Sequence, residues 1–228
     1  MKVTIKAVAG SAAAALILIS TASCSRDRDM SQANGQAPHF QTSEEAVAQG
    51  KKDILEVLRI SPEVKLGMDA AQVERSTPDQ ALSVIEVDFQ KLLEAGSADS
   101  LRRLAGDSKG NATPLLVDGQ VIGLIETSKG AKGWSVSAIG NQLLEDDLNA
   151  IKATPFGTSK LDYFEVPNIQ ARIFEVSTGG KAGYLTRYDG FSLQRTIGIE
   201  ELLPRLRQDA LEFQKLYGDQ LKEQKLVK

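Results

Sequence analysis

The clearest alternation of apolar and polar positions lies in the middle of the chain. Two apolar runs, at 115–117 and 121–125, flank the pair Asp118-Gly119. A tight type I′ hairpin needs a positive φ at both central residues, and Asp-Gly is among the pairs that adopt it most easily. A third run, at 134–138, alternates with a period of two. The pattern therefore predicts an antiparallel meander of three strands, which helices elsewhere in the chain must cover.

Helical spacing dominates the chain before this meander. Thr42 and Glu45 form a capping box, in which each side chain binds the free backbone amide of the other residue. Pro78 and Gly96 stand where the first position and the C-terminal cap of another helix are expected. From this pattern we expect helices at 42–61, 77–96 and 97–106, a short helix at 69–74 within an otherwise irregular 63–76, and a polar loop at 106–112.

Helix and strand patterns also alternate after the meander. Asn141 can cap a helix that ends at Lys152, and a last helix at 200–216 carries Pro204, whose missing amide costs least in the first turn. Between these helices we expect strands at 161–166, 169–176, 183–188 and 191–195, the last two joined by a second Asp-Gly pair at Asp189-Gly190. The pattern predicts an α+β fold with helices in the N-terminal half, an antiparallel sheet, one intervening helix, and a C-terminal helix packed on the sheet.

These elements predict that residues 42–218 form either a single α+β domain or two small α-βββ modules, followed by a frayed tail at 219–228. Strands followed by a helix occur twice, and this order is similar in outline to tandem PepSY or cystatin-like modules. The first Asp-Gly hairpin opens its group of strands, whereas the second closes its group. This difference argues against a clean internal duplication.

Residues 1–23 have the pattern of an export signal. Lys2 and Lys6 precede an apolar run at 7–19. The run is shorter than the roughly 20 residues that span a bilayer, and it has the length of the apolar region of a signal peptide. Small residues follow it, as a cleavage site requires. Segment 1–23 is therefore predicted to be a signal peptide.

The small residues at the end of this segment are Thr21, Ala22 and Ser23, and Cys24 comes next. They resemble the lipobox of bacterial lipoproteins, in which the cysteine is lipidated and begins the mature chain. Cys24 is the only cysteine of the chain, and leucine is more usual where Thr21 stands. The resemblance implies a lipid anchor on Cys24. Cleavage after Ala22 is the alternative and would give a soluble secreted or periplasmic protein.

Residues 24–41 have few apolar positions and no periodicity, so we expect a flexible linker behind the anchor. A linker of this length reaches roughly 20–25 Å. In lipoproteins of the enteric type, an Asp after the cysteine retains the protein at the inner membrane. Ser25 therefore implies sorting to the outer membrane, facing the periplasm. His39 also lies in the linker and is expected to be exposed, because catalytic groups need rigid support.

Composition excludes several classes of function. The net charge is −3 before loss of the two lysines of the leader, so the chain lacks the basic excess that nucleic acids need. One cysteine and one histidine exclude an internal disulfide and the usual zinc clusters. The glycine-rich spacings that bind phosphate are absent. We therefore expect no cofactor, no metal, no nucleic-acid partner and no enzymatic activity.

Acidic residues offer the remaining route to catalysis. Glu165 and Glu175 fall on adjacent predicted strands, with Asp162 nearby. A pair of carboxylates can perform acid–base work if an apolar pocket raises one pKa. The acidic run 145–147 is expected to be a solvated helix start, because adjacent helical residues do not face one another and the dipole favours acids there. A carboxylate-based hydrolase is therefore the weaker alternative.

Basic and aromatic residues gather on the last predicted strands. Arg172, Arg187 and Arg195 fall on neighbouring strands, with Tyr184 and Tyr188 close in sequence. On a shared face the arginines would grip carboxylates or phosphates of a protein partner in the envelope. On separate faces they would belong to a solvated side of the sheet. We expect a lipid-anchored binding or structural module of the cell envelope, with a carrier of an apolar ligand as the alternative.

Overall fold

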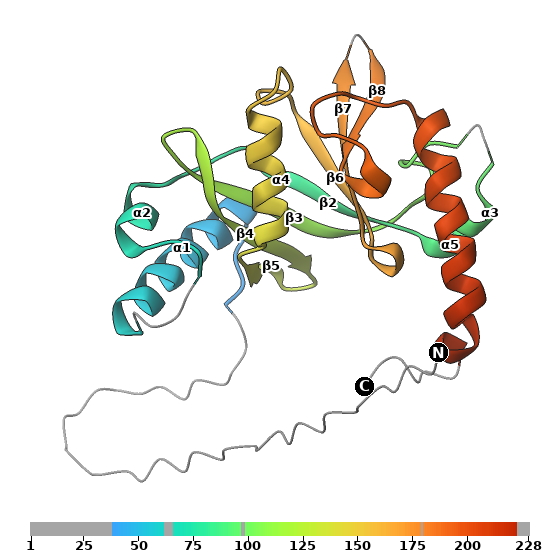
Figure 1. Cartoon of the computed structure of the whole chain (residues 1–228). Helices are drawn as coiled ribbons and strands as arrows, with labels where there is room; N and C mark the ends of the chain where they lie inside the picture. The colour runs from blue at the N-terminus through green and yellow to red at the C-terminus, as the bar shows by residue number, and fades with distance from the viewer. Residues whose placement is uncertain (1–37, 62–65, 97–98, 179, 223–228) are drawn as a thin grey trace, which may run out of the picture. The chain divides into compact units, whose positions relative to one another are not determined.

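The computed structural model describes residues 38–61, 66–96, 99–178 and 180–222. The predicted signal peptide, the predicted lipidation site Cys24 and most of the predicted linker lie outside the described residues. Ala37–Lys228 forms one compact unit, and the eight strands of its described residues form a single sheet (Figure 1). The described residues form five α-helices, the last of which packs on the sheet. The α+β prediction is therefore confirmed.

The helices and strands follow one another along the chain as two mixed groups. The α-helices are α1 (Ser43–Ile60), α2 (Ala70–Arg75), α3 (Phe89–Glu94), α4 (Gln142–Lys152) and α5 (Ile199–Lys222). The strands are β1 (Thr77–Pro78), β2 (Leu82–Val87), β3 (Ala105–Val117), β4 (Gln120–Gly130), β5 (Gly133–Ile139), β6 (Leu161–Val166), β7 (Ala171–Thr178) and β8 (Lys181–Thr186). Two short 3-10 helices are η1 (Pro167–Ile169) and η2 (Tyr188–Gly190).

The sheet consists of two antiparallel meanders joined through one parallel pair. Its strand order is β5-β4-β3-β2-β6-β7-β8, with β1 paired to β3. Strands β2 and β6 run parallel, whereas the other pairs are antiparallel. The predicted central hairpin is confirmed, because Asp118 and Gly119 have φ values of 51° and 80° and Val117 pairs with Gln120. Both groups of strands thus contribute to one sheet instead of each forming its own.

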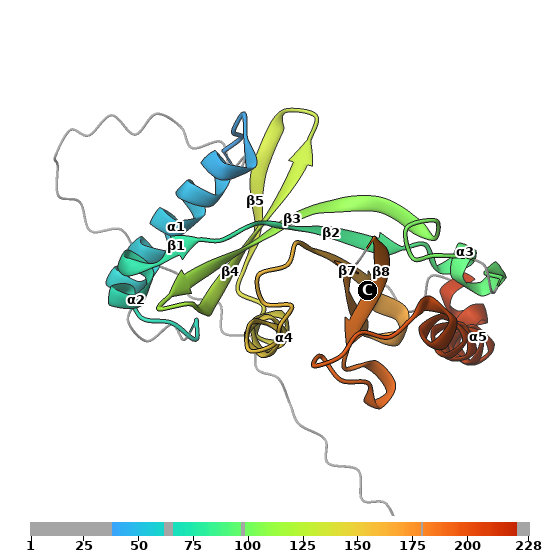
Figure 2. The ribbon, with the colours of Figure 1, turned by 90° about the horizontal axis from the view of Figure 1, so that it is seen from above.

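Helices cover both faces of this sheet. Helix α4 packs on one face, where Leu148 lies in a cluster with Leu124 and Tyr163. The next residue on each of these two strands points to the other face: Ile125 packs against α1 and α2, and Phe164 packs against α3 and α5. Helices α1 and α4 accordingly lie on opposite sides of the sheet (Figure 2). The central strands are therefore buried on both faces.

The prediction of one helix at 77–96 is wrong, because this segment forms β1, β2 and the short helix α3. In β2, Leu82 and Val84 pack on the α4 side, whereas Ile85 and Val87 pack on the α3 and α5 side. That is a period of two, and β2 is paired on both edges, by β3 and by β6. Sheet pairing on two sides therefore outweighs the helical spacing of the same apolar residues.

Three smaller expectations also change. Residues 101–103 form a turn instead of part of a helix, and residues 106–112 belong to β3 instead of a polar loop. Pro204 lies inside α5, beyond its first turn. The short helix expected at 69–74 is confirmed as α2, which Asp69 caps by accepting from the Gln72 amide at 2.7 Å.

The chain after β8 does not form the predicted second hairpin. Asp189 and Gly190 adopt positive φ values of 50° and 78° within η2, and residues 191–195 contain no strand. The chain returns as a loop instead, and Ile197 forms an isolated antiparallel bridge with Tyr184. A single bridge to the outer edge of β8 replaces the strand that the sequence pattern predicts.

Candidate functional site

Two of the three predicted arginines meet at one buried carboxylate. Arg172 on β7 donates from Nε to Asp147 Oδ2 at 3.0 Å, and Arg187 after β8 donates from Nε to Asp147 Oδ1 at 2.8 Å. The Asp147 side chain is only 4% exposed, whereas those of Arg172 and Arg187 are 28% and 57% exposed. A carboxylate of α4 therefore holds two guanidinium groups together, and we call them the Arg172–Arg187 pair.

The local structure of α4 and β7 positions Asp147 and Arg172. Asn141 caps α4 by accepting from the Leu144 amide at 3.2 Å. Asp147 follows Leu144 by three residues, which places it on the side of the helix that faces the sheet. Arg172 precedes Ile173, whose side chain is buried on the opposite face, so strand alternation directs Arg172 toward α4.

A single hydroxyl group fixes the backbone that carries both arginines. Thr186 Oγ1 donates to the Arg172 carbonyl oxygen at 2.6 Å and accepts from the Tyr188 amide at 3.0 Å. This contact turns the chain at the end of β8, where Arg187 has φ −95° and ψ −2°. The turn directs the Arg187 guanidinium back to α4 and Asp147.

The cluster has an excess of one positive charge, because two guanidinium groups share one carboxylate. In the described part of the chain, each arginine uses only its Nε for a hydrogen bond. The NH₂ groups of Arg172 and Arg187 therefore remain available. A guanidinium group is planar and can bind a carboxylate or phosphate through two parallel hydrogen bonds. The arrangement can accept one external anionic group.

Acidic residues surround the pair on the same face of the sheet. Glu165 is the cross-strand neighbour of Arg172. Burial raises the pKa of the Glu165 carboxyl, and the negative charges of Glu86 and Glu126 raise it further. Lys109 lies on this face as well, and its Nζ pairs with Glu86 Oε2 at 2.6 Å. These acids disfavour an extended polyanion and favour a single anionic group at the Arg172–Arg187 pair.

The other three predicted site residues lie elsewhere. Tyr184 is 1% exposed and belongs to the core on the α5 side of the sheet. Burial raises the pKa of its hydroxyl to about 12. Tyr188 donates its hydroxyl hydrogen to Asp209 on α5, and Arg195 is exposed in the loop after η2. The predicted five-residue binding face therefore reduces to Arg172 and Arg187.

A second charged cluster lies on the opposite face of the sheet. Arg102 donates from Nε to Glu175 Oε1 at 2.6 Å and also pairs with Asp162. Glu165 points to the α4 face instead, as its cross-strand neighbour Arg172 does. The three carboxylates considered for acid–base work thus do not converge. Asp162 and Glu175 bind Arg102, and Glu165 lies on the other face of the sheet.

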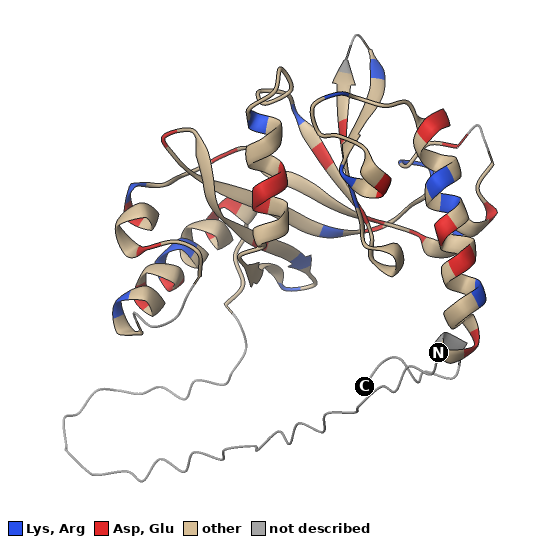
Figure 3. Cartoon of the chain, viewed as in Figure 1, with Lys and Arg blue, Asp and Glu red and all other residues tan. Residues whose placement is uncertain are grey.

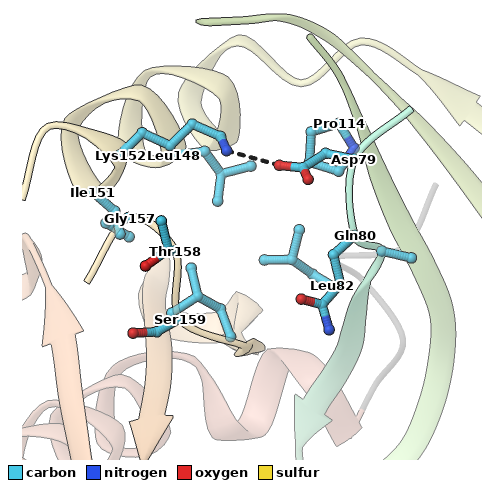
Figure 4. Close-up of a pocket in the computed structure, with 12 residues that line it drawn as sticks. Asp79, Gln80, Leu82, Pro114, Leu148, Ile151, Lys152, Gly157, Thr158 and Ser159 are labelled. Atoms are coloured by element: carbon cyan, nitrogen blue, oxygen red, sulfur yellow. Dashed lines mark hydrogen bonds and ion pairs between the residues drawn. The ribbon is translucent and has the colours of Figure 1, made fainter. Parts of the chain in front are cut away.

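A pocket of about 290 Å³ opens where α4 ends beside the start of β2. Lys152 in the last turn of α4 donates from Nζ to Asp79 Oδ2 at 2.7 Å, and this ion pair closes one end of the pocket (Figure 4). The loop at 157–159 forms one wall, and the β1–β2 connection forms the opposite wall. Leu82 and Leu148 project into the space between the walls.

The prediction that the acidic run 145–147 is a solvated helix start is wrong for Asp147, whose side chain is buried. A signal was present in the spacing. Asp147 lies three residues after Leu144 and four before Ile151, so it shares the apolar face of α4. An acid in such a position must be paired when it is buried. The Asp79–Lys152 pair was missed because 77–96 was predicted to be a helix.

Charged residues of both signs are spread over the helices and the sheet (Figure 3). Within the described ranges, no group of His, Cys, Asp and Glu side chains could hold a metal ion. A comparison of the chain with protein-family models, with curated proteins and with solved structures finds no significant match.

Proposed function

We propose that the chain is a lipid-anchored binding module of the cell envelope that holds an anionic group of a protein partner at the Arg172–Arg187 pair. One observation carries this proposal: two guanidinium groups converge on Asp147, and their NH₂ groups are left without another partner among the described residues. Arg102 differs, since it is bound by two carboxylates. In the Arg172–Arg187 pair, two arginines share one carboxylate, so the pair can bind a further carboxylate.

The partner group that fits best is a carboxylate next to an apolar side chain. Leu143 lies one turn before Asp147 on α4 and is 60% exposed. A partner Asp, Glu or chain end would bind the Arg172–Arg187 pair through two parallel hydrogen bonds, and an adjacent apolar side chain would cover Leu143. Because Arg187 is more than half exposed, salt should weaken the contact.

The proposed location rests on the N-terminal sequence pattern. The lipobox-like residues that end at Cys24 support a lipid anchor, and Ser25 supports sorting to the outer membrane with the domain in the periplasm. The linker would let the domain reach partners roughly 20–25 Å from the membrane surface. No helix in the part of the chain that the structure describes is long and apolar enough to cross a bilayer. A soluble secreted or periplasmic protein remains the alternative.

The alternative of a carrier for an apolar ligand has less support. The pocket at the end of α4 is lined by Asp79, Gln80, Lys152 and two hydroxyl residues as well as by leucines. A carrier of an apolar ligand would bury its cargo in a mainly apolar cavity. The mixed lining instead suits a small polar molecule.

A binding assay with matched peptides tests the proposed function. Fluorescence anisotropy would compare a labelled peptide that carries a Leu-Glu pair with the same peptide carrying Leu-Gln. Replacing Arg187 by glutamine should weaken binding of the Glu peptide about tenfold or more, which is the usual effect of losing a charge-assisted hydrogen bond. Arg195→Gln is the matched control, because it removes the same charge from another exposed arginine.

The expected pattern has two parts. The Glu peptide should bind more tightly than the Gln peptide, and higher salt should reduce this difference. The Arg195→Gln protein should behave as the wild type does. Equal affinity for the two peptides, or equal losses for Arg187→Gln and Arg195→Gln, would contradict a specific role for the Arg172–Arg187 pair.

A further inference from the structure

The pocket at the end of α4 joins an apolar surface to a charged rim. Its apolar part comes from buried side chains of β2, β3 and α4, among them Leu82, Pro114 and Leu148. Its polar part comes from Asp79, Gln80, Lys152, Thr158 and Ser159. Small-molecule sites commonly combine an apolar surface with a few polar groups that fix orientation. At about 290 Å³, the volume lies near the lower limit of roughly 300 Å³ for such sites.

Several polar groups of the pocket are free to bind a ligand. The hydroxyl groups of Thr158 and Ser159 and the side-chain amide of Gln80 make no hydrogen bond to any residue that the structure describes. The two hydroxyl residues lie on the wall that faces Asp79 (Figure 4). Each hydroxyl group can donate one hydrogen bond and accept others. These groups can therefore bind polar groups of a ligand in the pocket.

The Asp79–Lys152 ion pair restricts the charge of a ligand. The side chains are 34% and 25% exposed, so both charges are partly withdrawn from water. Burial alone would raise the pKa of the Asp79 carboxyl, but hydrogen bonds from the Lys152 side chain and the Gln80 backbone amide, with the lysine's charge, hold this pKa below its usual range. A purely cationic or purely anionic ligand would satisfy one member of the pair and leave the other with an uncompensated charge.

We propose that this pocket binds a small α-amino acid with an aliphatic side chain. The ammonium group would pair with Asp79, and the carboxylate would pair with Lys152 and accept from the hydroxyl groups of Thr158 and Ser159. The aliphatic side chain would lie against Leu82 and Leu148. A zwitterion keeps both members of the ion pair compensated, and the pocket volume fits one amino acid instead of a peptide.

The wall that carries the hydroxyl groups is held in place by the chain itself. A Cβ at Gly157 would lie 2.5 Å from the Lys152 carbonyl oxygen, so the loop packs directly against the end of α4. Thr154 Oγ1 donates to the Ile151 carbonyl oxygen at 2.6 Å and accepts from the Phe156 amide at 3.1 Å. A wall fixed in this way lowers the cost of ordering the site when a ligand binds.

Three ligands of similar shape test separately how much the ammonium group and the carboxylate contribute to binding. L-leucine carries both, L-leucinamide lacks the carboxylate, and 4-methylpentanoate lacks the ammonium group. Isothermal titration calorimetry on the purified protein should show leucine binding about 10–100-fold more tightly than either analogue, which is the range for losing one charge-assisted contact. Asp79→Asn should weaken leucine binding more than binding of 4-methylpentanoate. Lys152→Gln should weaken leucine binding more than binding of leucinamide.

A second measurement needs only the wild-type protein. In amide-resolved NMR spectra of the wild-type protein, leucine should shift the signals of residues 79–82 and 157–161. Neither Arg172 nor Arg187 lines this pocket. Failure of the proposed peptide site would therefore leave this result unchanged.

Two outcomes would overturn the proposal. The first is equal affinity for leucine and 4-methylpentanoate, which would show that the ammonium group is not recognised. The second is the absence of shifts at those amides with leucine at about 10 mM, a concentration that would reveal even a millimolar Kd.

Discussion

Replacing Asp147 by asparagine tests whether one carboxylate holds the two arginines. The change leaves no cavity, because the two side chains have nearly the same shape. The asparagine oxygen could accept from the Nε of either Arg172 or Arg187, but its NH₂ group would then face the other donor. The variant thus loses the negative charge and one of the two hydrogen bonds, and it leaves two guanidinium groups beside each other.

The expected loss of stability follows from the exposure of each partner. A hydrogen bond to a charged group contributes about 1.5–3 kcal/mol when it is sheltered, and Arg172 is 28% exposed. Arg187 is 57% exposed, so its share should be close to the 0.2–1 kcal/mol that is typical of surface ion pairs, or about 0.5 kcal/mol. Asp147→Asn should therefore lower the free energy of unfolding by at most about 2–3.5 kcal/mol. For a chain of this length each kcal/mol shifts the melting temperature by about 2–4 °C.

Urea unfolding followed by circular dichroism would measure the difference. Asp146→Asn is the matched control, because Asp146 is exposed on the same helix and its loss should change the free energy by no more than about 0.5 kcal/mol. In a protein that already carries Arg172→Gln and Arg187→Gln, the buried carboxylate has lost its charged partners. There, Asp147→Asn should be neutral or stabilising.

The comparison between the two backgrounds decides the question. If Asp147→Asn lowers the free energy of unfolding by the same amount in the protein without the two arginines, the effect comes from helix α4 itself and not from the ion pairs. Equal effects of Asp147→Asn and Asp146→Asn would show that the ion pairs contribute nothing measurable. Either result would refute the inference that Asp147 holds Arg172 and Arg187 together.

Three further predictions concern other parts of the chain. Cys24→Ser should release the protein from membranes into the soluble fraction, and a wild-type protein that is already soluble after export would contradict the lipid anchor. Gly119→Val should lower the free energy of unfolding by about 1–3 kcal/mol because φ is 80° at that position, whereas Gly119→Asn should lower it less. Equal melting temperatures for the wild type and both variants would show that this turn does not determine stability. Glu165→Gln should stabilise the protein at neutral pH, because burial raises the pKa of this carboxyl above its unfolded value and its ionisation therefore opposes folding. The gain should vanish as the pH falls below the unfolded pKa of glutamate, and urea titrations showing the same gain at low pH would contradict this cause.

Local signals were sufficient for elements whose ends are fixed by neighbouring residues. The Thr42–Glu45 capping box begins α1, and Thr42 Oγ1 accepts from the Glu45 amide at 3.2 Å. Asp118-Gly119 closes the central hairpin, and Asn141 caps α4. In each case both partners lie within four residues, so the sequence contains the whole interaction.

Contacts between distant segments could not be predicted in this way. Gly50 in α1 looks like a weak position for a helix, but a Cβ there would lie 3.0 Å from Ile125 Cγ2 and 3.2 Å from Val136 Cγ2. The glycine therefore lets α1 approach the sheet closely. Asn149 accepts from the Val121 amide and donates to the Val121 carbonyl oxygen, both at 2.8 Å. Its side chain thus satisfies the backbone of β4 at Val121, which β5 leaves unpaired, and nothing near it in sequence indicates that role.

The candidate site was only partly predictable for a similar reason. Strand alternation places Arg172 on the opposite face of β7 from Ala171 and Ile173, and that part depends on adjacent residues alone. The position of Arg187 depends on the turn after β8, and that of Arg195 depends on the bridge from Ile197 to Tyr184. The decisive residue is Asp147, which lies 25 residues before Arg172 and 40 before Arg187. An acid on the apolar face of a helix requires a cationic partner, but its spacing does not identify that partner. Only the pairing of β6, β7 and β8 beneath α4 selects these two arginines, and this pairing also leaves their NH₂ groups available to an anionic partner.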